Sequence, residues 1–169
     1  MPKVDVTVRR ATTDDGEALV AALLAAVNWA PERPPLDRDA VLADPAMSHY
    51  VAGWPRAGDL GVVAVAGPVV GAVVGAAWLR VLPPDDPGYG YVAPGVPELS
   101  IGVRPEYRGR GVGRQLLRAL LAAARDEGVP RVSLSVERAN RARRLYVSEG
   151  FRVVASGRDA DTMVRELAT

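Results

Sequence analysis

With 169 residues, 49% of them hydrophobic, the chain is long enough for one well-filled core and short for two, so we expect a single domain over residues 1–169. Its net charge of +1 gives no general attraction to nucleic acid, which we do not expect as a partner. The absence of cysteine excludes disulfides, thiolate metal sites and a cysteinyl acyl-enzyme, and the single histidine, His49, argues against a His-rich metal site or a Ser-His-Asp triad, so no metal is expected.

The N-terminal segment, Met1 to Asp5, alternates charge with valine and is unlike a secretory signal. No apolar run in the sequence reaches the length that crosses a membrane. We therefore expect a cytoplasmic protein with no membrane partner. Val4, Val6 and Val8 alternate with polar residues, which predicts a half-buried first strand.

Two helices are predicted in the next part of the chain. Thr12 or Thr13, followed by acidic residues, is typical of an N-cap, and the helix should run through Leu19 to about Val27. Residues 37–43 suit a short second helix. Aromatic residues follow each of the two, and their simplest interpretation is packing of loops onto the core. They are Trp29, His49, Tyr50 and Trp54.

Valine-rich runs dominate the middle of the chain. Leu60 to Ala66 and Val69 to Leu82 predict two strands joined by a tight turn at Gly67-Pro68, and the glycines at 71 and 75 indicate a bulge or a close backbone approach. The Pro- and Gly-rich composition of residues 83–95 predicts a long loop. Glu98 to Val103 is the fourth predicted strand, which Pro105 ends.

A glycine-rich segment, Arg108 to Gly113, follows that strand and opens a leucine-rich helix. Glycines let the backbone approach a ligand closely, and the unpaired N–H groups at a helix N-terminus favour an anion, so we predict a phosphate site. A Walker loop would need a lysine and a hydroxyl residue that do not follow here. The dinucleotide motif Gly-x-Gly-x-x-Gly fails because Arg114 stands at its last position.

Apolar residues between 112 and 124 recur at helical spacing, with Gly128 as the expected helix end. The remaining predicted elements are a strand over Arg131 to Val136, a helix that carries Tyr146 and ends at Gly150, and a final hairpin of Phe151 to Ala155 with Thr162 to Leu167.

Two motifs in this half of the chain resemble the GCN5-related N-acetyltransferases (GNAT). Arg108-x-x-Gly111-x-Gly113 is similar to the family's pyrophosphate loop, and Asn140-x-Ala-x-x-Leu-Tyr146-x-x-x-Gly-Phe is similar to a second family segment further on. The resemblance covers about residues 98–152 and is weak before residue 58. It implies the family's α/β fold, a mixed, mostly antiparallel seven-stranded sheet with helices on both faces and a V-shaped opening between the fourth and fifth strands. It also implies acetyl-CoA as the acyl donor.

The resemblance assigns the cofactor contacts residue by residue. Main-chain atoms of Ile101, Gly102 and Val103 would face the pantetheine arm and the thioester, with the Val103 N–H polarising the acetyl oxygen. Asn140 would hydrogen-bond the pantetheine arm. The pyrophosphate would be held by Arg108, Gly109, Arg110, Gly111, Val112, Gly113 and Arg114. Four arginines near Asn140 form a basic cluster. They would be a solvated helix face, or at most one of them would contact the 3′-phosphate of the cofactor. The cluster consists of Arg138, Arg141, Arg143 and Arg144.

By the same resemblance, Tyr146 would protonate the departing thiolate, or would only pack its helix on the sheet. Glu98 would be the base, directly or through water, or else a solvated carboxylate at a strand end. Trp29, Tyr89 and Tyr91 would line the acceptor pocket, or would be ordinary loop residues. The region between the first two helices borders that pocket in the family, so His49, Tyr50 and Trp54 are of interest there too, with loop packing as the alternative. Some family members carry the base on the next strand, where Ser135 could not serve.

We therefore expect an N-acetyltransferase that moves an acetyl group from acetyl-CoA to a primary amine by direct attack. Two alternatives stay open: a non-catalytic module that binds or senses acyl-CoA, and a transferase for a longer acyl group. A homodimer would be in keeping with the resemblance. The acceptor is not identified by any charged constellation in the sequence.

Overall fold

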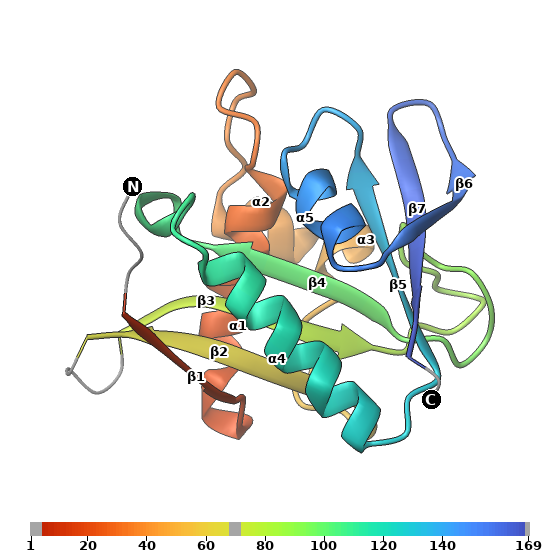
Figure 1. Cartoon of the computed structure of the whole chain (residues 1–169). Helices are drawn as coiled ribbons and strands as arrows, with labels where there is room; N and C mark the ends of the chain where they lie inside the picture. Colours follow the sequence, from red (N-terminus) through yellow and green to blue (C-terminus); the bar gives the residue numbers. More distant parts are fainter. Residues whose placement is uncertain (1–4, 68–71, 168–169) are drawn as a thin grey trace.

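The computed structural model describes residues 5–67 and 72–167. A seven-stranded sheet runs through the molecule in the order β1-β2-β3-β4-β5-β7-β6, with helices on both faces (Figure 1). The strands are β1 Val6–Arg10, β2 Leu60–Ala66, β3 Val73–Arg80, β4 Glu98–Val103, β5 Arg131–Glu137, β6 Arg152–Ser156 and β7 Ala160–Glu166. The helices are α1 Gly16–Val27, α2 Arg38–Ala43, α3 Pro45–Ser48, α4 Val112–Asp126 and α5 Ala142–Ser148, with 3-10 turns at Thr13–Asp15 and Pro105–Tyr107.

Neighbouring strands are antiparallel except for β4 and β5, which are parallel. This arrangement confirms the expected fold class.

Local sequence signals explain where the first helices begin. Thr12 caps the 3-10 turn that leads into α1, and its hydroxyl and backbone form a reciprocal capping box with Asp15. Asp37 caps α2 by accepting the backbone N–H of Ala40 at 2.8 Å. Both predicted helices are confirmed. The short α3 was not predicted, although Asp44 as its N-cap and Pro45 in its first turn are ordinary start signals.

The strand predicted over Val69 to Leu82 is β3, and it ends earlier than predicted. It ends at Arg80, and Leu82 instead packs in the core. Its predicted start, Val69, lies outside the described residues, together with Val70 and Gly71. The bulge expected near Gly75 is confirmed, because the pairing register with β2 skips Val74.

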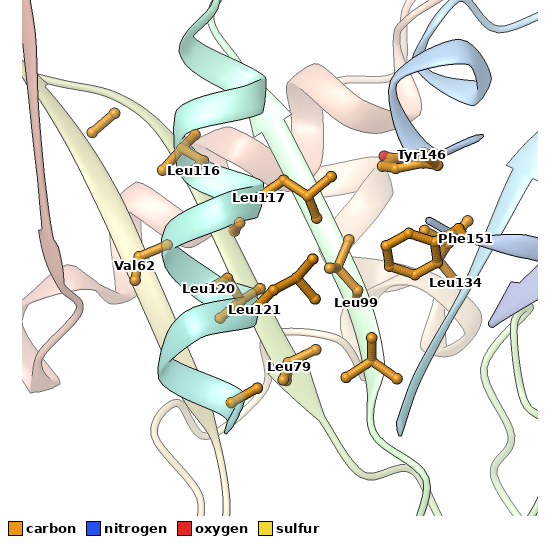
Figure 2. Packing of buried hydrophobic residues seen from close by; sticks show 14 of the residues in the cluster. Val62, Leu79, Leu99, Leu116, Leu117, Leu120, Leu121, Leu134, Tyr146 and Phe151 are labelled. Carbon is orange, nitrogen blue, oxygen red and sulfur yellow. The ribbon is translucent and has the colours of Figure 1, made fainter. Parts of the chain in front are cut away.

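The sheet buries a different core on each face. Leucines of α4 pack over β2 to β5 on one face, as Figure 2 shows for Leu116, Leu117, Leu120 and Leu121. On the other face α1 and the loops around α3 cover a smaller cluster centred on Trp78, which is fully buried and donates its indole N–H to the carbonyl oxygen of Tyr50 at 2.9 Å. These two cores fix the positions of α1, α4 and the residue 49–52 segment relative to β4.

Gly102 allows α1 to lie directly on β4. A Cβ at this position would lie 1.8 Å from the carbonyl oxygen of Ala22, so only glycine tolerates this contact. In the described part of the chain, no helix is both long and apolar enough to cross a bilayer.

Candidate active site

The parallel strands β4 and β5 are joined at one end only. Their register consists of a single pair, Glu98 with Ser133, next to a hydrogen bond from the Ser133 N–H to the Pro97 carbonyl oxygen at 3.0 Å. Beyond Glu98 the two strands diverge, and α5 lies beside the wider end (Figure 1). The edge of β4 that faces β5 is therefore left without strand pairing over most of its length.

Backbone direction places specific N–H groups on that free edge. The Arg104 N–H donates to the Val74 carbonyl oxygen at 2.8 Å, on the β3 side. Because successive residues of a strand point to opposite sides, the N–H groups of Val103 and Ile101 face β5 instead. This is the direction that the assigned role of Val103 requires. Gly102 points its backbone groups toward β3 and its hydrogens toward α1.

The loop before α4 exposes a run of free donors. Gly109 and Gly111 have φ values of 72° and 84°, in the left-handed region that glycine favours. Gly111 is the N-cap of the 15-residue α4 and has no side-chain oxygen to occupy the helix end. Among the described residues, the backbone N–H groups from 109 to 114 are not donated to another backbone group. This arrangement suits a diphosphate.

The arginine side chains of this loop are mostly turned elsewhere. Arg108 donates to the carbonyl oxygens of Val103 and Ala25, at 3.3 and 2.8 Å, and so ties the end of β4 to α1. The Arg114 guanidinium pairs with Glu149. Any contact of Arg114 with a diphosphate would therefore come from its N–H group. Arg110 lies over the Tyr107 ring, 5.8 Å from its centroid.

Asn140 begins the turn that leads into α5. Its side-chain oxygen accepts the Ala142 N–H at 3.0 Å, which leaves the side-chain amide donors for a ligand. Next to it is a surface hollow lined by the basic cluster. Two of the four arginines, Arg138 and Arg143, bind Asp161 at 2.9 and 3.0 Å. Within the described ranges, Arg141 and Arg144 make no ion pair, so they are the two cations of this cluster that a phosphate could engage.

Glu98 lies at the apex of the opening and is buried, with 5% of its surface exposed. The interpretation of Glu98 as a solvated carboxylate at a strand end is therefore wrong. Its Oε2 accepts the Tyr50 hydroxyl at 2.5 Å, and the same hydroxyl oxygen accepts the Tyr89 N–H at 2.8 Å. Its Oε1 is buried and has no hydrogen-bond partner in the described structure. One carboxylate oxygen is thus anchored by Tyr50, and the other lies without a hydrogen bond against the residue 83–97 loop.

Burial raises the pKa of Glu98, while the Tyr50 hydrogen bond, the Gly90 N–H and the charge of His49 oppose that rise. Burial also raises the pKa of the Tyr50 phenol, with the neighbouring Glu98 charge adding to the effect. Tyr50 therefore stays a hydrogen-bond donor at neutral pH. A carboxylate with a raised pKa is better matched to proton transfer near pH 7 than an ordinary one.

The residue 83–97 loop closes over this carboxylate. A Cβ on Gly88 would lie 2.1 Å from Glu98 Oε1, and a Cβ on Gly90 would lie 2.6 Å from the Leu134 carbonyl carbon. Glycine at both positions lets the loop pass close to β4 and β5. The loop thereby removes Glu98 from water.

Tyr146 is 6% exposed and lies in the larger core, with its ring 5.8 Å from that of Phe151. Figure 2 shows it under α5, near Phe151, with its oxygen at the end that faces α4. Burial raises the pKa of its phenol, so it carries its proton at neutral pH. Packing and proton donation are both compatible with this position.

The aromatic residues assigned to the acceptor pocket are not gathered into one cluster. The Trp29 indole N–H donates to Glu137 at 2.7 Å, and Arg33 lies over the same ring and bonds the same carboxylate. The Arg33 hydrogen bond holds the pKa of Glu137 below its usual range. Tyr89 is 65% exposed, and Tyr91 is half-buried in the loop. Trp29 thus marks the far end of β5, and only the Tyr89 backbone reaches Glu98, through Tyr50.

Sequence reasoning placed two residues near the acceptor pocket but not beside Glu98. Tyr50 and His49 lie beside Glu98, from which they are 48 and 49 positions away in the chain. No local pattern reports such a contact. The description of these aromatics as loop packing holds for Trp54, which covers Gly61 and donates to the Thr12 carbonyl oxygen at 3.0 Å.

Within the described ranges, no group of three or more His, Asp or Glu side chains is placed to hold a metal ion. The groups gathered at the site are a buried carboxylate, two protonated phenols and backbone donors.

Comparison with known proteins places these features in context. Residues 23–151 match the model of the Acetyltransferase (GNAT) family. The mycothiol acetyltransferase of Propionibacterium freudenreichii subsp. shermanii is 34% identical over 144 residues, which are 85% of this chain and 42% of that protein. The N-alpha-acetyltransferase RimI of Mycobacterium tuberculosis is 49% identical over 76 residues, which are 40% of this chain and 46% of that protein. The chain thus spans less than half the length of these relatives.

Among solved structures, the putative acetyltransferase yncA of Salmonella typhimurium, determined with its cofactor acetyl-CoA, superposes with a TM-score of 0.67. The two proteins are 25% identical, and the match covers 98% of this chain and 95% of that one. The similarity therefore extends over the whole sheet and its helices.

Proposed function

The chain belongs to the acetyltransferase (GNAT) family, and on that premise we propose that it transfers an acetyl group from acetyl-CoA to a primary amine by direct attack. The observation that carries the proposal is the opening between β4 and β5. It has a buried carboxylate at its apex and a loop of free N–H donors at its mouth. Glu98 and Val103 stand at opposite ends of β4, about 16 Å of extended strand apart, so a bound substrate would carry its phosphate near one end and react near the other.

Each protein group has one step in this mechanism. When bound, acetyl-CoA supplies the thioester. Glu98 removes a proton from the acceptor ammonium, because an alkylamine with a pKa of about 10 is mostly protonated and not nucleophilic at pH 7. A free N–H group on the β5 side of β4 stabilises the charge that develops on the acetyl oxygen. Ile101 offers such a group nearer to Glu98, whereas Val103 is five residues, about 16 Å of strand, away from Glu98 and suits the pantetheine arm instead. Tyr146 donates its proton to the departing sulfur.

The direct route is supported by the residues available. With no cysteine in the chain, an acyl-thioester intermediate on the protein has no nucleophile. Ser133 and Ser135 lie on the same strand near the apex, but His49 is held by Asp86 rather than by either serine. A single displacement on the thioester is the mechanism that fits.

We expect thiol release from acetyl-CoA in the presence of an amine, measured across a panel that includes small amines and peptides with a free N-terminus. Both kinds of acceptor are included because the relatives carry the names mycothiol acetyltransferase and N-alpha-acetyltransferase. Saturable binding of acetyl-CoA without thiol release from any amine would contradict the proposal and favour a sensing module. A faster reaction with a longer acyl-CoA than with acetyl-CoA would show that the chain transfers a longer acyl group.

Tyr146→Phe should lower kcat by about tenfold or more and leave KM for acetyl-CoA nearly unchanged, because general acid catalysis acts on the chemical step. Tyr107→Phe is the matched control. It removes a phenol hydroxyl beside the glycine-rich loop before α4 and keeps the ring next to Arg110, so kcat should stay near the wild-type value. A Tyr146→Phe enzyme with the wild-type rate at every pH would show that this tyrosine only packs α5 on the sheet.

A further inference from the structure

A second polar cluster lies directly behind Glu98 and has no part in the mechanism above. It consists of His49, at the end of α3, and Asp86, in the residue 83–97 loop. His49 Nδ1 lies 2.9 Å from Asp86 Oδ1. His49 is 7% exposed, whereas the Asp86 side chain is 55% exposed. The pair therefore connects the buried interior around Glu98 with the solvent.

Tyr50 joins this pair to the carboxylate. The His49 and Tyr50 rings pack edge to face with their centroids 4.6 Å apart, and the Tyr50 hydroxyl is bonded to Glu98. The imidazole and the carboxylate thus belong to one buried cluster.

Each of the two groups presents an unpartnered polar atom. His49 Nε2 and Glu98 Oε1 are both buried, and neither has a hydrogen-bond partner among residues 5–67 and 72–167. Buried polar atoms in folded proteins are almost always paired, so two such atoms in one cluster indicate a functional use. Since Nδ1 faces a carboxylate, it carries the proton and Nε2 is left as an acceptor.

Building on the proposed function, we propose that His49, held by Asp86, is a positioning residue for Glu98 and carries the proton of the acceptor amine from Glu98 toward solvent. The amine N–H bond breaks as an O–H bond forms on Glu98. The proton then passes to His49 Nε2 through a bridging water molecule and gives an imidazolium whose charge Asp86 balances. Loss of the Nδ1 proton to bulk water on the Asp86 side leaves the Nε2–H tautomer, and exchange of the remaining proton from Nε2 to Nδ1 through water restores both groups.

The surroundings of His49 favour this direction of transfer. The charged and titratable groups that face it are Asp86 from the loop, Glu98 from β4, Tyr50 from its own segment and Arg80 from β3. Arg80 donates to the His49 carbonyl oxygen at 2.9 Å and is itself paired with Asp59, so its charge is already balanced. Of the two carboxylates near the imidazole, Asp86 is the one exposed to water, so the proton leaves on that side.

The test compares kcat and its pH profile in the wild type, His49→Ala and Asp86→Asn. His49→Ala should lower kcat by about tenfold or more, without a matching rise in KM for acetyl-CoA. Asp86→Asn, a change at a half-exposed side chain, should lower kcat by a smaller factor. Its pH profile should differ from that of the wild type in the same direction as the profile of His49→Ala. Asp85→Asn is the matched control, because Asp85 is an exposed neighbour, and it should leave both unchanged.

Chemical rescue separates proton transfer from packing. Added imidazole should restore part of the rate of His49→Ala, whereas pyrazole, which has the same shape and is a far weaker base, should not. Equal rescue by both, or wild-type kcat and pH profile in Asp86→Asn, would overturn the inference. No thiol release by the wild type would instead overturn the proposed function on which it rests.

Discussion

Glu98→Gln is expected to lower kcat by about 100-fold or more at neutral pH, the usual scale for loss of a general base. The amide keeps the shape of the side chain and can still accept the Tyr50 hydroxyl, but it cannot take a proton. The wild-type rate should fall as the pH falls through the raised pKa of Glu98, because the base must be ionised. That limb of the pH profile should be absent in the variant.

The pH dependence of stability shows whether Glu98→Gln loses activity by unfolding. Because burial places the folded-state pKa of Glu98 above its unfolded value, ionisation of the carboxylate costs stability. The cost is absent below the unfolded pKa and grows as the pH rises through the folded pKa. Glu98→Gln should therefore be at least as stable as the wild type at pH 7, so that its loss of activity is not due to unfolding. Glu106→Gln, at an exposed position, is the matched control for activity. A Glu98→Gln enzyme with the wild-type kcat would exclude Glu98 as the base.

Asp59→Ala should reduce the free energy of unfolding by about 3 to 5 kcal/mol, the range for removal of one partner of a buried ion pair. Asp59 and Arg80 lie 2.7 Å apart, and their side chains are 2% and 1% exposed. The variant leaves the Arg80 charge buried without its counter-ion. Urea unfolding measures the loss. Arg80 also donates to the carbonyl oxygens of His49 and Ala52, at 2.9 and 2.7 Å, so kcat should fall as the segment that holds Tyr50 loosens.

An exposed ion pair provides the comparison for this result. Arg38 and Glu17 are also 2.8 Å apart, but their side chains are 49% and 80% exposed. Arg38→Ala should cost less than about 1 kcal/mol, because water and salt screen such a pair. Equal losses of stability in Asp59→Ala and Arg38→Ala would contradict the assignment of Arg80 and Asp59 as the anchor of the residue 49–59 segment.

Local sequence patterns predicted most of the secondary structure, since helix caps and strand alternation are readable within a few residues. Asp37 before α2 and Gly128 after α4 are examples of such signals, and Gly128 has the φ of 75° expected at a helix end. The opening between β4 and β5 could be predicted only from the resemblance of the motifs. Periodicity reports which face of a strand is buried, but not which edge is left unpaired.

The environment of Glu98 was beyond sequence reasoning for a physical reason. Its burial results from the long loop that crosses it at Gly88 and Gly90, and its hydrogen bond comes from Tyr50. These contacts arise from tertiary packing between distant segments, and the buried Arg80 that anchors one of those segments looks in sequence like an ordinary strand end. The pairing of the Arg114 guanidinium with Glu149 is a further contact between distant segments that sequence reasoning did not predict, and it leaves the Arg114 N–H for the assigned phosphate site.

The central claim is that a coenzyme with a diphosphate binds along β4, with its phosphates on the N–H groups of residues 109–114. Isothermal titration calorimetry of the purified chain with coenzyme A and with pantetheine, which lacks the phosphates, tests it most directly. We predict saturable binding of coenzyme A at one site, with pantetheine weaker by about 100-fold or more, since charge-assisted hydrogen bonds are lost. No heat with coenzyme A, or equal affinity for the two compounds, would contradict the account.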